Sequence, residues 1–134
     1  MRRFVAVTTE GAWLLCVLTL VAIAATYPLI RHMTTHLPGD LGDPVLVAWI
    51  LAWDADAVRH GVARIFDAPS FSPYLHTLVY SEHMFGVAVF TAPLQWLGAR
   101  PVLVYNIAFI GSFVQAGAGM YLLARALTDR KSVV

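Results

Sequence analysis

Three long runs without a charged residue constrain the fold of this chain more than any other feature. They cover residues 11–30, 84–99 and 101–124, and the charged residues lie outside them. About 20 apolar residues in a helix span a hydrocarbon core of roughly 30 Å. Hydrophobic residues make up 59% of the chain and charged residues 13%, against about 45–50% and 25% in soluble domains. The sequence therefore predicts an all-α membrane protein with about three transmembrane helices.

The residues around the first run, 11–30, indicate the orientation of the chain. Arginines at positions 2 and 3 precede it, and positive charge favours a cytoplasmic N-terminus. A secretory signal peptide is the alternative, because residues 22–24 resemble a cleavage site. The apolar stretch continues beyond that point to residue 30, which argues against cleavage. We therefore expect a multi-pass chain with the segment 31–83 as an outer loop.

The second and third runs are separated by Arg100 alone, which predicts a helical hairpin. The second run is short for a span and contains Pro93, so we expect a kinked helix packed within a bundle. Two amides on the third run, Asn106 and Gln115, are expected to hydrogen-bond between helices, with a functional role as the alternative. The small residues that would allow close helix packing on this run are Gly111, Ser112, Ala116, Gly117, Ala118 and Gly119.

A further helix is predicted inside the outer loop, starting at Asp43. Asp43 fits the N-cap, Pro44 the first helical position, and Gly61 the position after the end. The apolar residues that recur at helical spacing are Leu46, Trp49, Ile50, Trp53 and Ala57. We expect this juxtamembrane helix to lie in the membrane interface with its tryptophans at headgroup depth. The following residues, 62–80, predict an ordered return loop.

Asp40 and Asp43 form the clearest chemical candidate. They are three residues apart on a glycine-containing turn outside the predicted membrane. Such carboxylates can act as a general base or hold a divalent cation. The alternative is structural, with Asp43 as a helix cap and Asp40 as a turn residue. Spacing alone favours this alternative.

Other titratable residues flank the same loop. His32 and His36 have a spacing that can bind zinc on a helix, but no third ligand lies at a typical spacing, so an incidental role is favoured. Glu82 and His83 precede the second run and either face the same site as the aspartates or mark a helix end. A net charge of +1 offers no basic surface for nucleic acid, and the lone Cys16 excludes a disulfide scaffold.

The order and spacing of several short motifs resemble the N-terminal part of bacterial GT-C class membrane glycosyltransferases. The matching residues are Tyr27-Pro28, His36-Leu37-Pro38-Gly39-Asp40, Gly42-Asp43-Pro44, Trp49, Trp53, Ser72-Pro73, Leu78-Val79-Tyr80-Ser81-Glu82-His83, Tyr105-Asn106 and Met120-Tyr121-Leu122-Leu123-Ala124-Arg125. The resemblance covers roughly residues 11–128. It implies a protein of the bacterial inner membrane.

The resemblance also implies a reaction and a set of site residues. The donor would be a polyprenyl-phosphate-linked sugar, and the acceptor a glycan, lipid or protein on the outer face. Asp43 would be the catalytic carboxylate, with Asp40 as its partner, and the two could hold a divalent cation such as Mg²⁺ or Mn²⁺. Glu82, His83 and Arg59 would contact the substrates, because a leaving phosphate needs cationic stabilisation.

Enzymes of this class have further spans, so the chain is expected to be an N-terminal fragment that is inactive alone. The alternative is part of a non-enzymatic polytopic protein, such as a transporter or an assembly subunit. A transporter would carry polar residues near the bilayer midplane, whereas those of this chain concentrate in the loop 31–83, which favours surface chemistry. Residues 129–134 match the translation of a common sequencing adapter, so we expect them to be a non-native tail.

Overall fold

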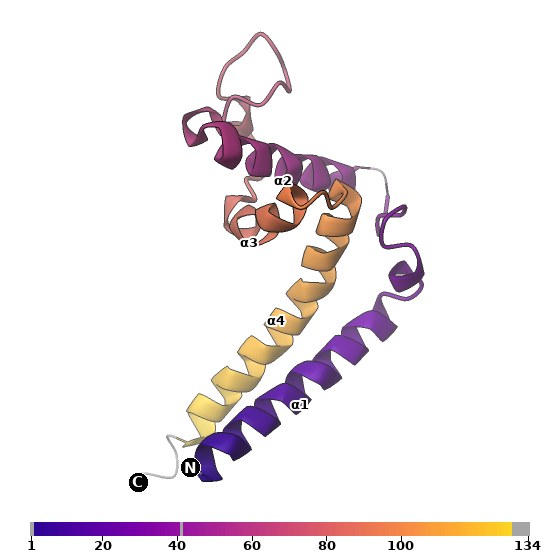
Figure 1. Ribbon diagram of the computed structural model, residues 1–134, viewed down its shortest axis with the longest axis vertical. Coiled ribbons are helices and arrows are strands. Elements are labelled where there is room, and N and C mark those ends of the chain that lie inside the picture. The colour runs from indigo at the N-terminus through magenta and orange to yellow at the C-terminus, as the bar shows by residue number, and fades with distance from the viewer. Residues whose placement is uncertain (1, 41, 130–134) are drawn as a thin grey trace. The chain divides into compact units, whose positions relative to one another are not determined.

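The computed structural model describes residues 2–40 and 42–129, and all of their regular structure is helical (Figure 1). In chain order the elements are α1 (Arg2–Ala25), the 3₁₀ helix η1 (Leu29–Arg31), α2 (Asp43–His60), η2 (Val62–Arg64), η3 (Thr77–Tyr80), α3 (Phe85–Trp96) and α4 (Pro101–Asp129). The prediction of an all-α chain is confirmed. Of the expected tail, residues 130–134 lie outside the described part.

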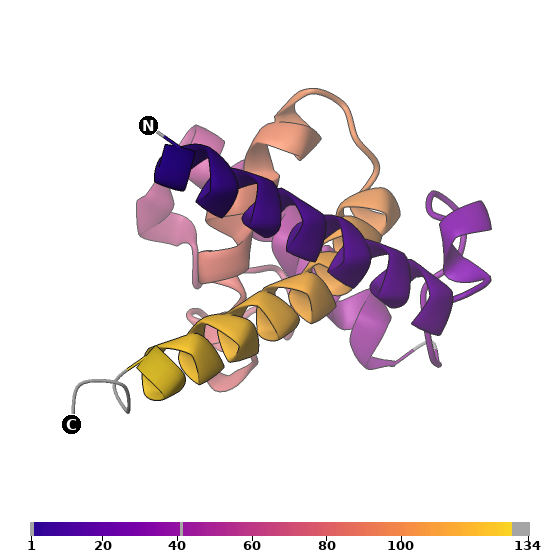
Figure 2. The ribbon, with the colours of Figure 1, turned by 90° about the horizontal axis from the view of Figure 1, so that it is seen from below.

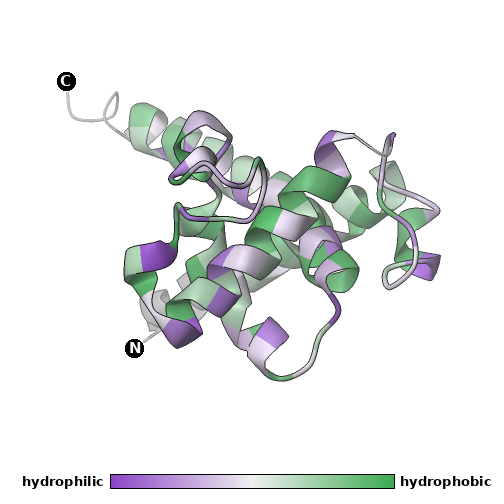
Figure 3. Cartoon of the chain, turned by 90° about the horizontal axis from the view of Figure 1, so that it is seen from above, coloured by the Kyte–Doolittle hydropathy of each residue, from purple (hydrophilic) through white to green (hydrophobic). Residues whose placement is uncertain are grey.

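The described residues divide into two compact units. Residues 2–30 and 109–129 belong to the first unit, and residues 31–40 and 42–108 belong to the second. The long helices α1 and α4 are continuous in both views (Figures 1 and 2). Hydrophobic residues predominate along the helical ribbons (Figure 3).

The third apolar run becomes the longest helix, α4. Within the described residues, one helix is long and apolar enough to cross a membrane, and it covers Pro101–Thr128. A shorter apolar stretch, Glu10–Ala25, lies in α1. The 12 residues of α3 would extend about 18 Å at 1.5 Å per residue, less than a hydrocarbon core of roughly 30 Å. The expected count of three spans is therefore not confirmed.

Helices α1 and α3 both end before the last residue of their apolar runs. Helix α1 stops at Ala25, because Pro28 disfavours helical geometry at Tyr27 and has no N–H to donate. Helix α3 stops at Trp96, and Gly98 follows with a φ of 93°, a left-handed value that glycine adopts freely. Hydropathy does not reveal either helix end, because the residues that follow each end are also largely apolar.

The helix predicted after position 43 is present as α2, but its N-cap differs from the prediction. Gly42 is the N-cap residue, and no side chain caps the helix by a hydrogen bond. Asp43 instead occupies the first turn, where its charge is favoured by the helix dipole. At the other end Gly61 ends the helix as predicted, with a φ of 146° and its N–H donated to the carbonyl of Ala57 at 2.7 Å.

Helix α3 packs along α2. Gln95 donates its Nε2–H to the carbonyl oxygen of Leu51 at 3.0 Å, and Trp96 donates its Nε1–H to that of Ala55 at 2.9 Å. These carbonyls lie one helical turn apart, so the two side chains hold α3 in register with α2.

The loop between α2 and α3 is ordered, as predicted, and covers the tryptophan side of α2. Trp49 and Trp53 pack against a small core of Ile50, Ala68 and Leu78. Trp53 also donates its indole N–H to the carbonyl oxygen of Ile65 at 2.8 Å. The tryptophans expected at headgroup depth thus have protein partners, and the interfacial position of α2 remains a prediction.

Candidate functional site

Asp40 and Asp43 are both exposed, with Asp40 in the turn before α2 and Asp43 at the first residue of the helix. The Asp40 carboxylate accepts the backbone N–H of Gly42 at 3.0 Å, which fixes the turn. A Cβ atom at position 42 would lie 3.2 Å from Asp40 Oδ1, so glycine leaves room for this arrangement. The Asp43 carboxylate is exposed and accepts no capping hydrogen bond in the described part of the chain.

The start of α4 supports the segment that leads into this turn. Asn106 is fully buried, and its Nδ2 donates to the carbonyl oxygens of Met33 at 2.9 Å and His36 at 2.7 Å. The neighbouring Tyr105 lies close enough to Asp43 for an electrostatic interaction. The expectation that Asn106 joins two helices is wrong, because its partners are carbonyls of a turn.

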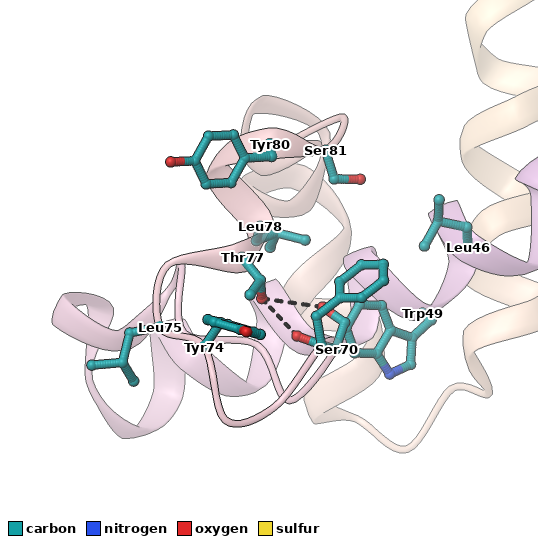
Figure 4. A pocket seen from close by; sticks show the side chains of 10 residues that line it. Leu46, Trp49, Ser70, Tyr74, Leu75, Thr77, Leu78, Tyr80 and Ser81 are labelled. Atoms are coloured by element: carbon teal, nitrogen blue, oxygen red, sulfur yellow. Dashed lines mark hydrogen bonds between the residues drawn. The ribbon is translucent and has the colours of Figure 1, made fainter.

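A pocket of about 620 Å³ opens beside the first turns of α2 (Figure 4). Its lining residues are Leu46, Trp49, Ser70, Phe71, Tyr74, Leu75, Thr77, Leu78, Tyr80 and Ser81. Those from α2 follow Asp43 by one and two turns. Among the described residues that line the pocket, none is charged at neutral pH. Aromatic rings and hydroxyl groups suit an uncharged molecule with apolar faces and polar edges.

Hydrogen bonds within the loop shape the far wall of the pocket. Thr77 Oγ1 lies 2.8 Å from the carbonyl oxygen of Ser70, to which it donates, and the two side-chain hydroxyls are 3.3 Å apart. Asp67 accepts the backbone N–H of His76 at 3.0 Å, and its carboxylate lies 2.9 Å from Nδ1 of the same histidine. These contacts close residues 67–77 into an ordered turn.

A second pair of titratable side chains, Asp54 and His83, meets at the centre of α2. Asp54 is fully buried, and neither of its carboxylate oxygens accepts a hydrogen bond from a described residue. Its Oδ1 lies 3.4 Å from Nε2 of His83, an atom that is also buried and without a hydrogen bond. Burial raises the pKa of Asp54, and the positive charge available on His83 partly opposes that rise.

The His83 ring is held between two phenylalanines. Its centroid lies 5.0 Å from that of Phe66 and 6.0 Å from that of Phe85. The backbone N–H of Phe85 points to Nδ1 at 3.3 Å. An acceptor at Nδ1 places the ring proton on Nε2, which faces Asp54. Nε2 therefore lies within ion-pair distance of the buried carboxylate, although the two groups make no hydrogen bond in this arrangement.

The structure brings together some predicted site residues and separates others. Asp40 and Asp43 lie at the start of α2, but His83 faces Asp54 and Glu82 is exposed. Arg59 is exposed in the last turn of α2. In the described part, no hydrogen bond or ion pair joins Glu82 or His83 to the two aspartates.

His32 and His36, in the loop before α2, lie next to each other. The rings of His32 and His36 lie 4.6 Å apart and are exposed. Within the described residues, no group of three or more His, Cys, Asp or Glu side chains is placed to hold a metal ion.

Sequence reasoning did not single out Asp54. The signal available was helical spacing. Ile50 and Leu51 precede Asp54 by four and three residues, and Ala57 follows by three. All three are buried, so Asp54 is an acidic residue on an apolar face.

Comparisons of the chain with protein-family models, curated proteins and solved structures find no match.

Proposed function

We propose that this chain is part of a polytopic membrane protein. The exposed apolar surface of α4 supports this proposal. Only 6% of the most apolar stretch of this helix is buried within the chain, whereas the core helix of a soluble protein is mostly buried. Large apolar side chains of α1 are also exposed, including Trp13 and Leu20. The proposed orientation has the N-terminus in the cytoplasm of a bacterial cell and residues 31–83 on the outer face.

The proposed activity is transfer of a sugar from a polyprenyl-phosphate donor to an acceptor hydroxyl. The observation that carries it is the exposed pair Asp40 and Asp43 at the start of α2, the helix whose residues Leu46 and Trp49 line an uncharged, aromatic pocket. Asp43 takes the proton of the acceptor hydroxyl as that oxygen attacks the anomeric carbon. The bond from that carbon to the phosphate oxygen breaks, and the lipid phosphate leaves with the electron pair. The pocket would hold the acceptor, because its lining carries no cation for a phosphate.

The roles of the other site residues are proposed from the chemistry of their side chains. The pair of exposed carboxylates fits a divalent cation, because Mg²⁺ is commonly held by one or two carboxylates together with substrate phosphates. Such an ion, held by Asp40 and Asp43, would neutralise charge on the leaving phosphate. Arg59 and Glu82 are proposed to contact substrates. The same role for His83 would require its Nε2 to leave Asp54. The activity belongs to the full-length parent, and the 134-residue chain alone is expected to be inactive.

The test replaces Asp43 by asparagine in the full-length parent. Asp43 makes no capping hydrogen bond, so Asp43→Asn should leave α2 intact while removing the proton acceptor. Transfer of labelled sugar from a polyprenyl-phosphate donor in membrane vesicles should fall by about 10²–10⁴-fold, as is typical for loss of a general base. The matched control is Asp56→Asn, an exposed aspartate later on α2, which should keep the wild-type rate. An unchanged rate in Asp43→Asn would contradict the assignment, and absence of transfer by the wild-type parent would favour a non-enzymatic protein.

A further inference from the structure

The buried pair of Asp54 and His83 joins the middle of α2 to the segment that leads into α3. His83 follows directly after Tyr80, Ser81 and Glu82, and the first two of these line the pocket. The wall of the pocket is therefore tethered to α2 through this contact. Tyr80, Ser81 and Glu82 are exposed, and the next apolar contact of the segment is Met84, which packs against the core of Ile50, Ala68 and Leu78.

We propose that Asp54 and His83 form a binding site for a single proton, whose occupancy keeps the segment 81–84 closed against α2. With one proton, the pair is either an ion pair or two neutral groups, and both are tolerated in a buried place. Removing the proton leaves a carboxylate without a counter-charge, which is strongly disfavoured in a low dielectric. The closed segment must then open so that water can reach Asp54.

Other charged groups around the pair do not replace the proton. On α2, Asp56, Arg59 and His60 are exposed, and Asp56 pairs with His60 at 3.0 Å. Arg64 on η2 is also exposed. Asp67 in the loop is engaged by His76. Helix α3 contributes no charged residue to the packing, and Glu82 lies on the exposed side of the segment.

The sign of the pH dependence follows from the raised pKa of Asp54. The closed state binds the proton more tightly than the open state, where the carboxyl has its ordinary pKa of about 4. Closure that depends on this proton therefore weakens as pH rises above that value and is lost as pH passes through the raised pKa of the closed state. Loss of one proton weakens closure by up to about tenfold per pH unit. The proposal does not depend on sugar transfer, because closure is a property of the chain itself.

The experiment measures hydrogen exchange of the backbone amides of residues 81–88 in the full chain, reconstituted in lipid nanodiscs, from pH 4 to pH 9. Protection factors are used, because they remove the intrinsic pH dependence of exchange. In the wild type, protection of this segment should fall with rising pH by up to about tenfold per unit. Amides of α4 serve as an internal reference and should keep their protection.

Two variants separate the pair from general effects of pH. Asp54→Asn has the same size but cannot lose a proton, so protection of the segment should no longer fall with rising pH. Asp56→Asn removes the exposed aspartate of the second Asp–His pair on α2 and should retain the wild-type profile. If Asp54→Asn loses helix content by circular dichroism, Asp54→Leu provides the same loss of charge in an apolar side chain. A flat profile in the wild type, or an unchanged slope in the Asp54 variant, would overturn the proposal.

Discussion

At the scale of single residues, two buried polar side chains organise the second unit in different ways. Asn106 satisfies two backbone carbonyls with one amide group, whereas Asp54 has its charge partner but no hydrogen bond. Both N–H donors of Asn106 are matched, as is usual for a buried polar group, although its Oδ1 has no hydrogen-bond partner among the described residues. Asp54 instead keeps a carboxylate in a place where its charged form is disfavoured. We therefore regard Asn106 as structural and Asp54 as the residue that responds to pH.

Replacing Asn106 by alanine tests its structural role. The substitution leaves the carbonyls of Met33 and His36 without their buried donor, so stability should fall by about 1–3 kcal/mol. Thermal unfolding in detergent micelles, followed by circular dichroism, measures the change. Gln115→Ala is the matched control, because Gln115 is an exposed amide on the same helix and its loss should change stability by less than about 0.5 kcal/mol. Equal effects of the two substitutions would show that the contacts of Asn106 contribute nothing.

At the scale of helices, the approach of α1 to α4 in the first unit involves Gly117, one of the small residues predicted to allow close packing. A Cβ atom at Gly117 would lie 2.6 Å from the Leu18 side chain of α1, whereas Gly111 and Gly119 have open space around them. The sequence pattern identified the group of small residues. The contact between α1 and α4 singles out Gly117, because a helix presents one face to a neighbour.

Gly117→Val should therefore lower the stability of the protein more than Gly119→Val, which lies on another face of α4. The larger side chain must displace the terminal methyl groups of Leu18, which belong to a flexible, half-buried side chain, so the cost should be about 1 kcal/mol, the lower end for overpacking. Gly119→Val places the same residue where no atom lies within 4 Å, so it controls for the helix propensity of valine. Thermal unfolding of both variants in the same detergent gives the comparison. The packing of α1 on α4 would be refuted by equal midpoints of unfolding.

At the scale of the whole molecule, the proposed topology determines which chemistry is accessible. Sugar transfer on the outer face requires residues 31–83 to lie outside the cell. The proposed orientation depends on the two arginines before α1. Cys16 offers a natural reference, because it lies in the apolar part of α1.

A cysteine introduced at Ala63 tests this topology. Ala63 is an exposed residue of η2, so Ala63→Cys should react with a membrane-impermeant maleimide in intact cells. In the unsubstituted chain Cys16 should stay unlabelled, because lipid shields it. Labelling of position 63 only after cell lysis would reverse the orientation and remove the outer-face site.

Much of the helical framework was predictable because its signals are local. Pro44 and Gly61 mark the ends of α2 through their own backbone preferences, and the uncharged run from 101 becomes α4. The ends of α1 and α3 were predicted less well. Hydropathy measures the polarity of side chains, whereas the helices end where Pro28 and Gly98 change the backbone.

The sequence by itself determined the helical class, the bounds of α2 and the exposed pair Asp40 and Asp43, since each depends on neighbouring residues. Only the tertiary structure decided that Asp54 is buried and that His83 is its partner. Their contact requires the ordered loop to bring the residues before α3 back onto α2. The burial of a charge depends on residues far away along the chain, and for that reason no local pattern around Asp54 or His83 identified the pair.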